Sequence, residues 1–285
     1  MTTPLGGAEP LIDVHAHFFP DGSGYHNGRH LNARRLEAGD RIGITYHVAS
    51  ILGSWGATSP TYFQSPADTV PANDAMLALQ HADPRVRAYV AVNPNDGAGA
   101  IAEVERCAAR GAVGLKLAAA RRCDDPVVAP LYACAAQYGF PVLHHIWQHR
   151  RRHWPGQDIS DGADLARAAA RHPTVAFILA HIGGGGDYAH TFAAVREVPN
   201  VYLDLSGSGV DRGMLDDALA AVGAQRLLWG ADITLCTGLA KLRALEVIGL
   251  PADDLSDIRW RNAARIFPAH AFPSLAGRLA GARHS

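Results

Sequence analysis

The sequence lacks an excess of charge of either sign. Its 285 residues carry 26 Lys and Arg against 27 Asp and Glu, for a formal net charge of -1 at pH 7. Nucleic acids and acidic membrane surfaces are recognised through strongly basic regions, and this balance supplies none. We therefore expect neither nucleic acid nor a membrane among the partners of this protein.

Cysteine and long apolar runs are also scarce. The four cysteines are scattered, and no two have the CxxC spacing. This favours reduced, structural thiols in a cytosolic protein. No stretch approaches the roughly 20 apolar residues of a membrane helix. The N-terminal MTTPLGGAEP has no basic region before an apolar core, so we expect no signal peptide and a cytoplasmic location.

What the sequence does contain is a regular alternation of strand and helix patterns. Short apolar, β-branched runs predict eight strands, and Ala-rich stretches between them predict helices, with Asp161 as an N-cap. The strands are expected at Leu11–His17, Ile42–Ile51, Val86–Val92, Val113–Leu117, Val142–Ile146, Val175–His181, Val201–Leu205 and Leu227–Trp229. The clearest helices are expected at Ala98–Arg110, Ala129–Tyr138, Asp161–Arg171 and Met214–Val222.

Strands separated by helices pair in parallel, because parallel neighbours need long connections. Eight such units predict a (β/α)8 TIM barrel that takes up residues 1–285 as a single domain. An open doubly wound sheet is the alternative, but no GxGxxG follows the first strand to favour its dinucleotide-binding version.

Two segments interrupt the regular pattern. Phe18–Asp40 is rich in Gly, His, Asn and Arg, and Gly53–Ala72 contains aromatic residues and prolines. Both follow early strands, so we expect them to be loops that build a pocket at the C-terminal face of the barrel.

The first predicted strand ends in Asp13-Val14-His15-Ala16-His17. Positions two apart on a strand share a face, so both histidines are expected to point inward, where imidazole suits a divalent metal. Two surface histidines at a strand end would explain this pattern equally well. Asp13 has the same parity and would either support a ligand or be an ordinary buried hydrogen-bonding residue.

Three more predicted strands end in side chains that can bind metal or transfer protons. His144 and His145 end the fifth strand, His181 ends the sixth, and Asp232 follows the eighth. The ends of parallel barrel strands meet at one mouth, so these side chains should converge there. Packing does not explain why these side chains all end strands at one mouth. Their convergence favours a metal site.

The chain also resembles a known family, the amidohydrolase superfamily, and within it the ACMSD-like "amidohydrolase 2" branch. The resemblance runs from residue 11 to about 268 through DVHAH, NDAMLALQHADPRVRAYVAVNP, VGLKL, GFPVLHHI, RHPTVAFILAHIGG, LLWGAD and NAARIF. It implies a distorted (β/α)8 barrel that holds one divalent metal ion.

The resemblance also implies roles for particular residues. The metal ligands would be His15, His17, His145 and Asp232, and His181 would handle protons. The family pattern places its histidine four residues after the proline of the fifth strand, which selects His145 over His144. Zinc is the expected ion, although such ligands also accept manganese, iron or cobalt.

Substrate recognition is harder to derive. Lys116 would contact a substrate carboxylate, bridge two metal ions or neutralise barrel carboxylates. Members of the family often have His-Pro after this strand, but this sequence has Ala118–Ala120 there. Arg150 begins a run of three arginines, which is either a solvated loop or a lid that binds a carboxylate. We expect a small-molecule substrate carrying a carboxylate, and a homodimer as the commonest assembly.

Two reactions fit this site. The first is hydrolysis of an amide, lactone or ester by a metal-activated water, with Asp232 as proton acceptor and His181 as general acid or base. The second is nonoxidative decarboxylation of an aromatic or unsaturated carboxylic acid. Some relatives with the second activity replace the first histidine by glutamate, and His15 is retained here, so the sequence favours hydrolysis. A barrel without catalysis is disfavoured, because the set of candidate ligands is intact.

Overall fold

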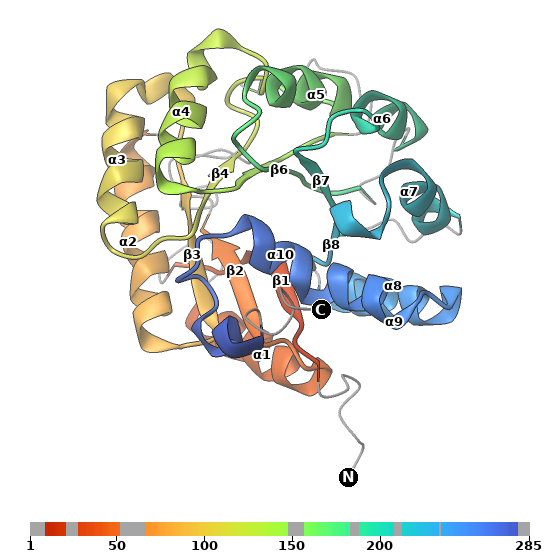
Figure 1. Ribbon diagram of the computed structural model, residues 1–285. Helices are drawn as coiled ribbons and strands as arrows, with labels where there is room; N and C mark the ends of the chain where they lie inside the picture. Colours follow the sequence, from red (N-terminus) through yellow and green to blue (C-terminus); the bar gives the residue numbers. More distant parts are fainter. Residues whose placement is uncertain are drawn as a thin grey trace.

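Eight short, buried strands alternate with helices in the computed structural model (Figure 1). The structure describes residues 9–20, 28–51, 66–147, 157–182, 188–207, 213–233 and 235–278. The strands are β1 (Ile12–His17), β2 (Tyr46–Ser50), β3 (Val86–Ala91), β4 (Gly114–Leu117), β5 (Val142–His144), β6 (Phe177–Leu179), β7 (Val201–Asp204) and β8 (Leu227–Leu228).

The helices follow the strands, and most of them cover the outside of the barrel. They are α1 (Gly28–Ile42), α2 (Pro66–Ala82), α3 (Ala98–Ala108), α4 (Ala129–Tyr138), α5 (Gly162–Arg171), α6 (Tyr188–Val195), α7 (Met214–Val222), α8 (Leu235–Ile248), α9 (Ala252–Ser256) and α10 (Asn262–Ile266). Asp161 caps α5 as predicted, because its carboxylate accepts hydrogen bonds from Ala163 N and Asp164 N. Within the described ranges, no helix combines the length and the apolar character that crossing a membrane requires.

Each strand pairs in parallel with the next, in the order β1 to β8. The ring closes where the last strand returns to the first. Val14 N donates to Trp229 O at 3.1 Å, Asp232 N donates to His15 O at 2.6 Å, and Ala16 forms a parallel bridge with Asp232. The predicted (β/α)8 barrel is therefore confirmed.

A β-bulge interrupts β1 between Asp13 and Ala16. Asp13 is opposite His47 and Ala16 is opposite Ala49, so three steps along β1 match two steps along β2. The predicted shared face of Asp13 and the histidines is therefore wrong for Asp13. Its carboxylate contacts Arg35 of α1 instead, because the extra residue reverses the alternation.

The segment Phe18–Asp40 is not simply a loop, as the sequence suggested. Helix α1 begins inside it at Gly28 and runs to Ile42, so β2 starts at Tyr46 rather than at Ile42. Leu, Arg, Ala and Glu are good helix formers, and the many polar residues obscured this pattern. In the same way, α2 covers the end of Gly53–Ala72, whereas residues 52–65 lie outside the described residues.

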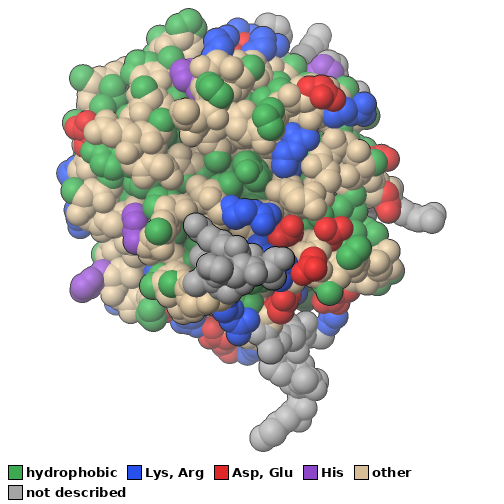
Figure 2. All heavy atoms as spheres, in the orientation of Figure 1, with side chains coloured by type: hydrophobic (Ala, Val, Ile, Leu, Met, Phe, Trp, Pro, Cys, Tyr) green, Lys and Arg blue, Asp and Glu red, His purple; other side chains and the backbone are tan. Residues whose placement is uncertain are grey.

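Apolar side chains pack in two buried clusters. The larger one lies between the strands and the helices, and includes Val142 and Phe177. The smaller one contains the alternate strand residues Leu143 and Ile178 together with Trp260 from the C-terminal helices. Because strand residues alternate between the clusters, the smaller one fills the barrel interior. Figure 1 shows α10 lying across the barrel, and Figure 2 shows basic and acidic side chains interspersed over the same face.

Candidate metal centre

The side chains of His15 and His17 meet at the carboxyl end of β1. Both are buried, and their Nε2 atoms lie 3.1 Å apart. The other ring nitrogen of His15, Nδ1, lies 2.6 Å from Asp204 Oδ2 and 3.1 Å from Ser206 Oγ. Because a carboxylate only accepts hydrogen bonds, it selects the tautomer with hydrogen on Nδ1, which places a lone pair on Nε2 of His15.

Ser50 of β2 orients His17 so that its Nε2 also faces the cluster. Its Nδ1 lies 3.3 Å from Ser50 O and 3.2 Å from Ser50 Oγ. The carbonyl oxygen can only accept, so it also favours hydrogen on Nδ1 and a lone pair on Nε2. Both imidazoles therefore present basic nitrogens to the same point.

Asp232 completes this cluster from the end of β8. Its Oδ1 lies 3.3 Å from His17 Nε2 and 3.7 Å from His15 Nε2, and its Oδ2 lies 3.4 Å from His181 Nε2. Burial alone would raise the pKa of Asp232. The electrostatic effect of the neighbouring His181 and the contacts with His17 and His181 outweigh burial and hold this pKa below its ordinary value.

The backbone is strained at two of these residues. Among the described residues other than glycine, a positive φ occurs at His181 (65°) and at Asp232 (56°). This left-handed region is unfavourable for residues with a Cβ, and such strain gathers at functional sites. Nearby Gly230 has no room for a side chain, because an added Cβ would overlap Asp204 Oδ1 and lie 3.1 Å from His15 Cβ.

The donor set suits one divalent cation. Ligand atoms of His15, His181 and Asp232 all lie within 4.8 Å of one another, and His17 adds a fourth near His15. Burial lowers the pKa of His15 and of His17, so both imidazoles are neutral at pH 7. Two nitrogen lone pairs and a carboxylate oxygen face each other, and a cation between them would remove this repulsion. Neutral imidazoles with one carboxylate match the preferences of zinc and manganese.

The fifth strand places its two histidines differently. The ring of His145 lies 4.3 Å from the ring of His181 and 3.9 Å from that of Trp147, measured between centroids. His144 is buried, and its Nδ1 lies 3.1 Å from His145 O. Burial lowers the pKa of His144 to about 4. His145 is thus the one whose ring lies beside the cluster, next to His181, which itself contacts Asp232 at 3.4 Å.

Lys116 reaches the cluster from β4. Its Nζ donates to His15 Nε2 at 3.0 Å, and the side chain is 1% exposed. Burial lowers its pKa to about 8, even though Asp232 and Asp204 oppose this effect. The other candidate for substrate binding, Arg150, lies outside the described residues.

Sequence reasoning missed several residues that support this site. Asp204 ends β7, and the rule that selected Asp232 could have found it. Ser206 donates to Asp204, and buried Lys241 of α8 donates to Gly207 O. Arg35 of α1 contacts Asp13. No local pattern indicates Lys241 or Arg35, because their partners are distant in the sequence.

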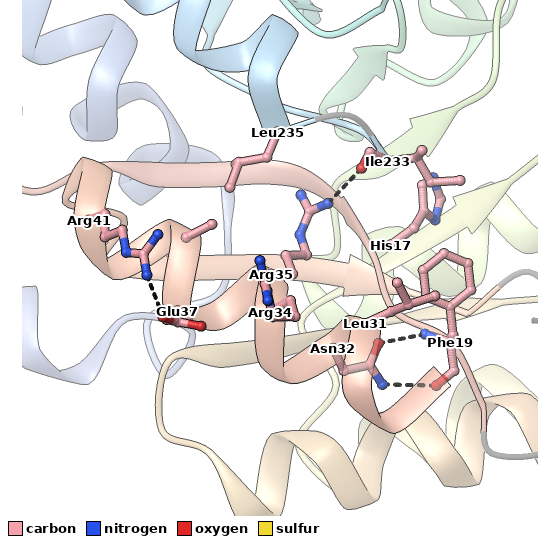
Figure 3. Close-up of a pocket in the computed structure, with 11 residues that line it drawn as sticks. His17, Phe19, Leu31, Asn32, Arg34, Arg35, Glu37, Arg41, Ile233 and Leu235 are labelled. Carbon is pink, nitrogen blue, oxygen red and sulfur yellow. Dashed lines mark hydrogen bonds and ion pairs between the residues drawn. The ribbon is translucent and has the colours of Figure 1, made fainter. Parts of the chain in front are cut away.

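A pocket of about 310 Å³ lies beside His17, between α1 and the start of α8 (Figure 3). Its apolar lining includes Phe19, Leu31 and Ile233, and Arg34 is an exposed charged residue in its wall. Part of the predicted pocket-building role of Phe18–Asp40 therefore belongs to a helix.

A family model described as amidohydrolase matches residues 12–269. A search of curated protein sequences gives no significant match.

This chain matches solved structures that have the same fold, and the match runs along nearly the whole length of those structures. A 5-carboxyvanillate decarboxylase from Sphingomonas paucimobilis is 18% identical, with a TM-score of 0.68, and covers 91% of this chain and 99% of its own. A dihydroxybenzoic acid decarboxylase from Polaromonas sp. JS666, solved with bound manganese and 2-nitroresorcinol, is 18% identical, with a TM-score of 0.67 and coverages of 90% and 96%. A candidate 2-pyrone-4,6-dicarboxylic acid hydrolase from Pseudomonas putida is 18% identical, with a TM-score of 0.58 and coverages of 90% and 96%.

Proposed function

Because this chain belongs to the amidohydrolase family, we propose that it is a metal-dependent enzyme that removes the carboxyl group of a small aromatic or unsaturated acid as carbon dioxide. The observation that carries the proposal is the buried ammonium of Lys116, 3.0 Å from His15 Nε2 within the candidate metal centre. A buried cation beside a metal site suits a substrate that carries negative charge. Hydrolysis, which the sequence favoured, becomes the second candidate.

We assign the metal ion to His15, His17, His145 and Asp232. A divalent ion bound there would supply positive charge to a coordinated oxygen of the substrate. The chain supports two of these ligands directly, since Asp204 orients His15 and Ser50 orients His17. Lys116 would pair with the substrate carboxylate or a neighbouring oxygen anion, and so fix the ring over the site.

We assign His181 as the proton donor of the reaction. Its Nε2 lies 3.4 Å from Asp232 Oδ2, within reach of the candidate metal centre. In the reaction, the imidazolium of His181 donates its proton to the ring carbon that bears the carboxyl group. The carbon–carbon bond then breaks, its electron pair stays on the ring, and carbon dioxide leaves. Water returns the proton to His181.

The related structures support the decarboxylation. The Sphingomonas and Polaromonas proteins are named for decarboxylation of aromatic acids, and the second was solved with manganese. The Pseudomonas protein is named for hydrolysis of a pyrone dicarboxylic acid, which keeps hydrolysis as the second candidate. In all three names the substrate is a small carboxylic acid.

The test uses the purified chain loaded with Mn²⁺ or Zn²⁺. It is incubated in D₂O with 2,6-dihydroxybenzoate, with 5-carboxyvanillate, and with 2-pyrone-4,6-dicarboxylate as the hydrolysis substrate. We expect carbon dioxide from a hydroxylated benzoate and one deuterium at the carbon that lost it, and neither with His181→Asn. Ring opening of the pyrone with ¹⁸O uptake from water, and no carbon dioxide from either benzoate, would replace this proposal by the second candidate.

A further inference from the structure

Helix α1 places one guanidinium group directly behind the candidate metal centre. The Arg35 side chain is 8% exposed, and its Nη2 donates to Oδ2 of the fully buried Asp13 at 2.8 Å. Its Nη1 donates to the carbonyl oxygen of Ile233 at 3.3 Å, and Figure 3 shows this contact spanning from α1 to the segment after β8. Arg35 therefore joins α1 to β1 and to the segment after β8.

The carboxylate of Asp13 extends this connection to the site. Its Oδ1 accepts hydrogen bonds from Ala231 N at 3.0 Å and from His15 N at 3.2 Å. The two residues that flank Asp232 are thus held by one ion pair, Ala231 through its N–H and Ile233 through its carbonyl. The backbone of His15 is held by the same carboxylate.

This arrangement accounts for a conformation that Asp232 does not adopt readily on its own. Its φ of 56° lies in the left-handed region, and such a residue keeps its shape only where the surroundings fix the backbone on both sides. We propose that Arg35 is a positioning residue, which through Asp13 and Ile233 holds Asp232 and His15 at metal-binding spacing. The inference rests on the metal centre of the proposed function.

The charge of Asp13 is balanced mainly by Arg35. His47 also faces this carboxylate, with its Nδ1 3.5 Å from Asp13 Oδ2, and the buried hydroxyl of Tyr89 interacts with it electrostatically. Burial lowers the pKa of His47, so it is neutral at pH 7. Arg41, on the same helix, pairs with Glu37 at the surface, where the two side chains are 70% and 55% exposed. It offers a matched control for the loss of an arginine from α1.

Two conservative variants test the connection. Arg35→Lys keeps the positive charge, but its single ammonium lacks the planar fork that reaches both Asp13 and Ile233. Asp13→Asn keeps an oxygen for Ala231 N–H and presents an amide N–H to Arg35, where no acceptor remains. Arg41→Met is the control. The readouts are the Mn²⁺ and Zn²⁺ dissociation constants, measured by competition with a chelator, and the melting temperature of the metal-free protein.

We expect Arg35→Lys and Asp13→Asn each to weaken metal binding about 10- to 100-fold, as loss of a residue that orients a ligand does elsewhere. Arg41→Met should stay within about twofold of the native chain, since exposed pairs contribute little. The double variant should bind metal no less tightly than the single variant that has the larger loss of affinity, because both changes break one connection.

Three results would overturn the inference. In the first, either variant binds metal as tightly as the native chain, whether or not its metal-free melting temperature falls, which would make the ion pair structural only. In the second, the losses in the double variant are additive, which would mean two independent effects. In the third, the native chain binds no divalent ion. Only that third result would also rule out the proposed metal centre. A failure of the positioning role is therefore distinguishable from a failure of the metal centre.

Discussion

Replacement of Asp204 by asparagine tests how the site controls its own ligand. Asp204 Oδ2 lies 2.6 Å from His15 Nδ1, and both side chains are fully buried. An asparagine amide placed there would direct N–H toward Nδ1. The imidazole would then favour hydrogen on Nε2, which is the nitrogen that must coordinate.

The size of the effect follows from this tautomer change. Loss of a residue that orients a metal-binding histidine weakens metal affinity about 10- to 100-fold, which equals about 1.4–2.7 kcal/mol of binding free energy. Burial raises the pKa of Asp204, so its buried charge is unfavourable in the metal-free protein. We therefore expect the metal-free Asp204→Asn protein to melt at or above the native temperature while it binds metal less tightly.

The measurement combines chelator competition with thermal melting of the metal-free protein. Asp74→Asn is the control, since Asp74 is a 46%-exposed carboxylate paired with surface arginines. It should leave the metal affinity unchanged. Native metal affinity in Asp204→Asn would refute the reasoning that this carboxylate sets the tautomer of His15. A fall in metal-free stability with no change in affinity would do the same.

Three further predictions concern the neighbouring residues. His17→Ala should lose both metal and activity, whereas His181→Asn should keep the metal and lose about 10²–10⁴-fold in kcat. Metal analysis of the two purified variants decides this, and metal loss in His181→Asn would make His181 a ligand. Gly230→Ala should lower the free energy of unfolding by about 1–3 kcal/mol in urea titration, because the added methyl group would overlap Asp204. An unchanged midpoint would contradict this close approach. Lys116→Met should raise KM for a carboxylate substrate. Because burial lowers the pKa of Lys116 to about 8, native binding should weaken as the pH rises through 8 and the ammonium loses its proton. The variant should show no such dependence, and a flat native profile would exclude a charged role for Lys116.

The sequence predicts the barrel and the meeting of its candidate site residues, because both depend on local periodicity. Alternation along β1 places His15 and His17 together, and the strand ends bring Asp232 and His181 to the same mouth. It fails at Asp13, because a one-residue bulge depends on pairing with β2 and leaves no signal in the strand itself.

The residues that support the site are harder to predict than the candidate ligands. Arg35 lies 22 positions from Asp13, and Asp204 lies 189 positions from His15. Their roles exist only once the barrel has closed. Helix α1 was obscured for a related reason, since its buried face is small and its polar residues resemble those of a loop.

The place where the barrel closes has a consequence for its dynamics. The backbone bonds that join β1 to the segment after β8 lie at His15 and Asp232, the same residues that would share the metal ion. A bound ion would therefore link β1 to the segment after β8 through its ligands. It would stabilise the closed barrel by mass action, with a gain that rises with free metal concentration. Transient opening of the ring should begin at this seam in the metal-free protein. Amide hydrogen exchange at Val14 and Asp232 should then slow when metal is added, while exchange in β4 and β5 stays nearly constant.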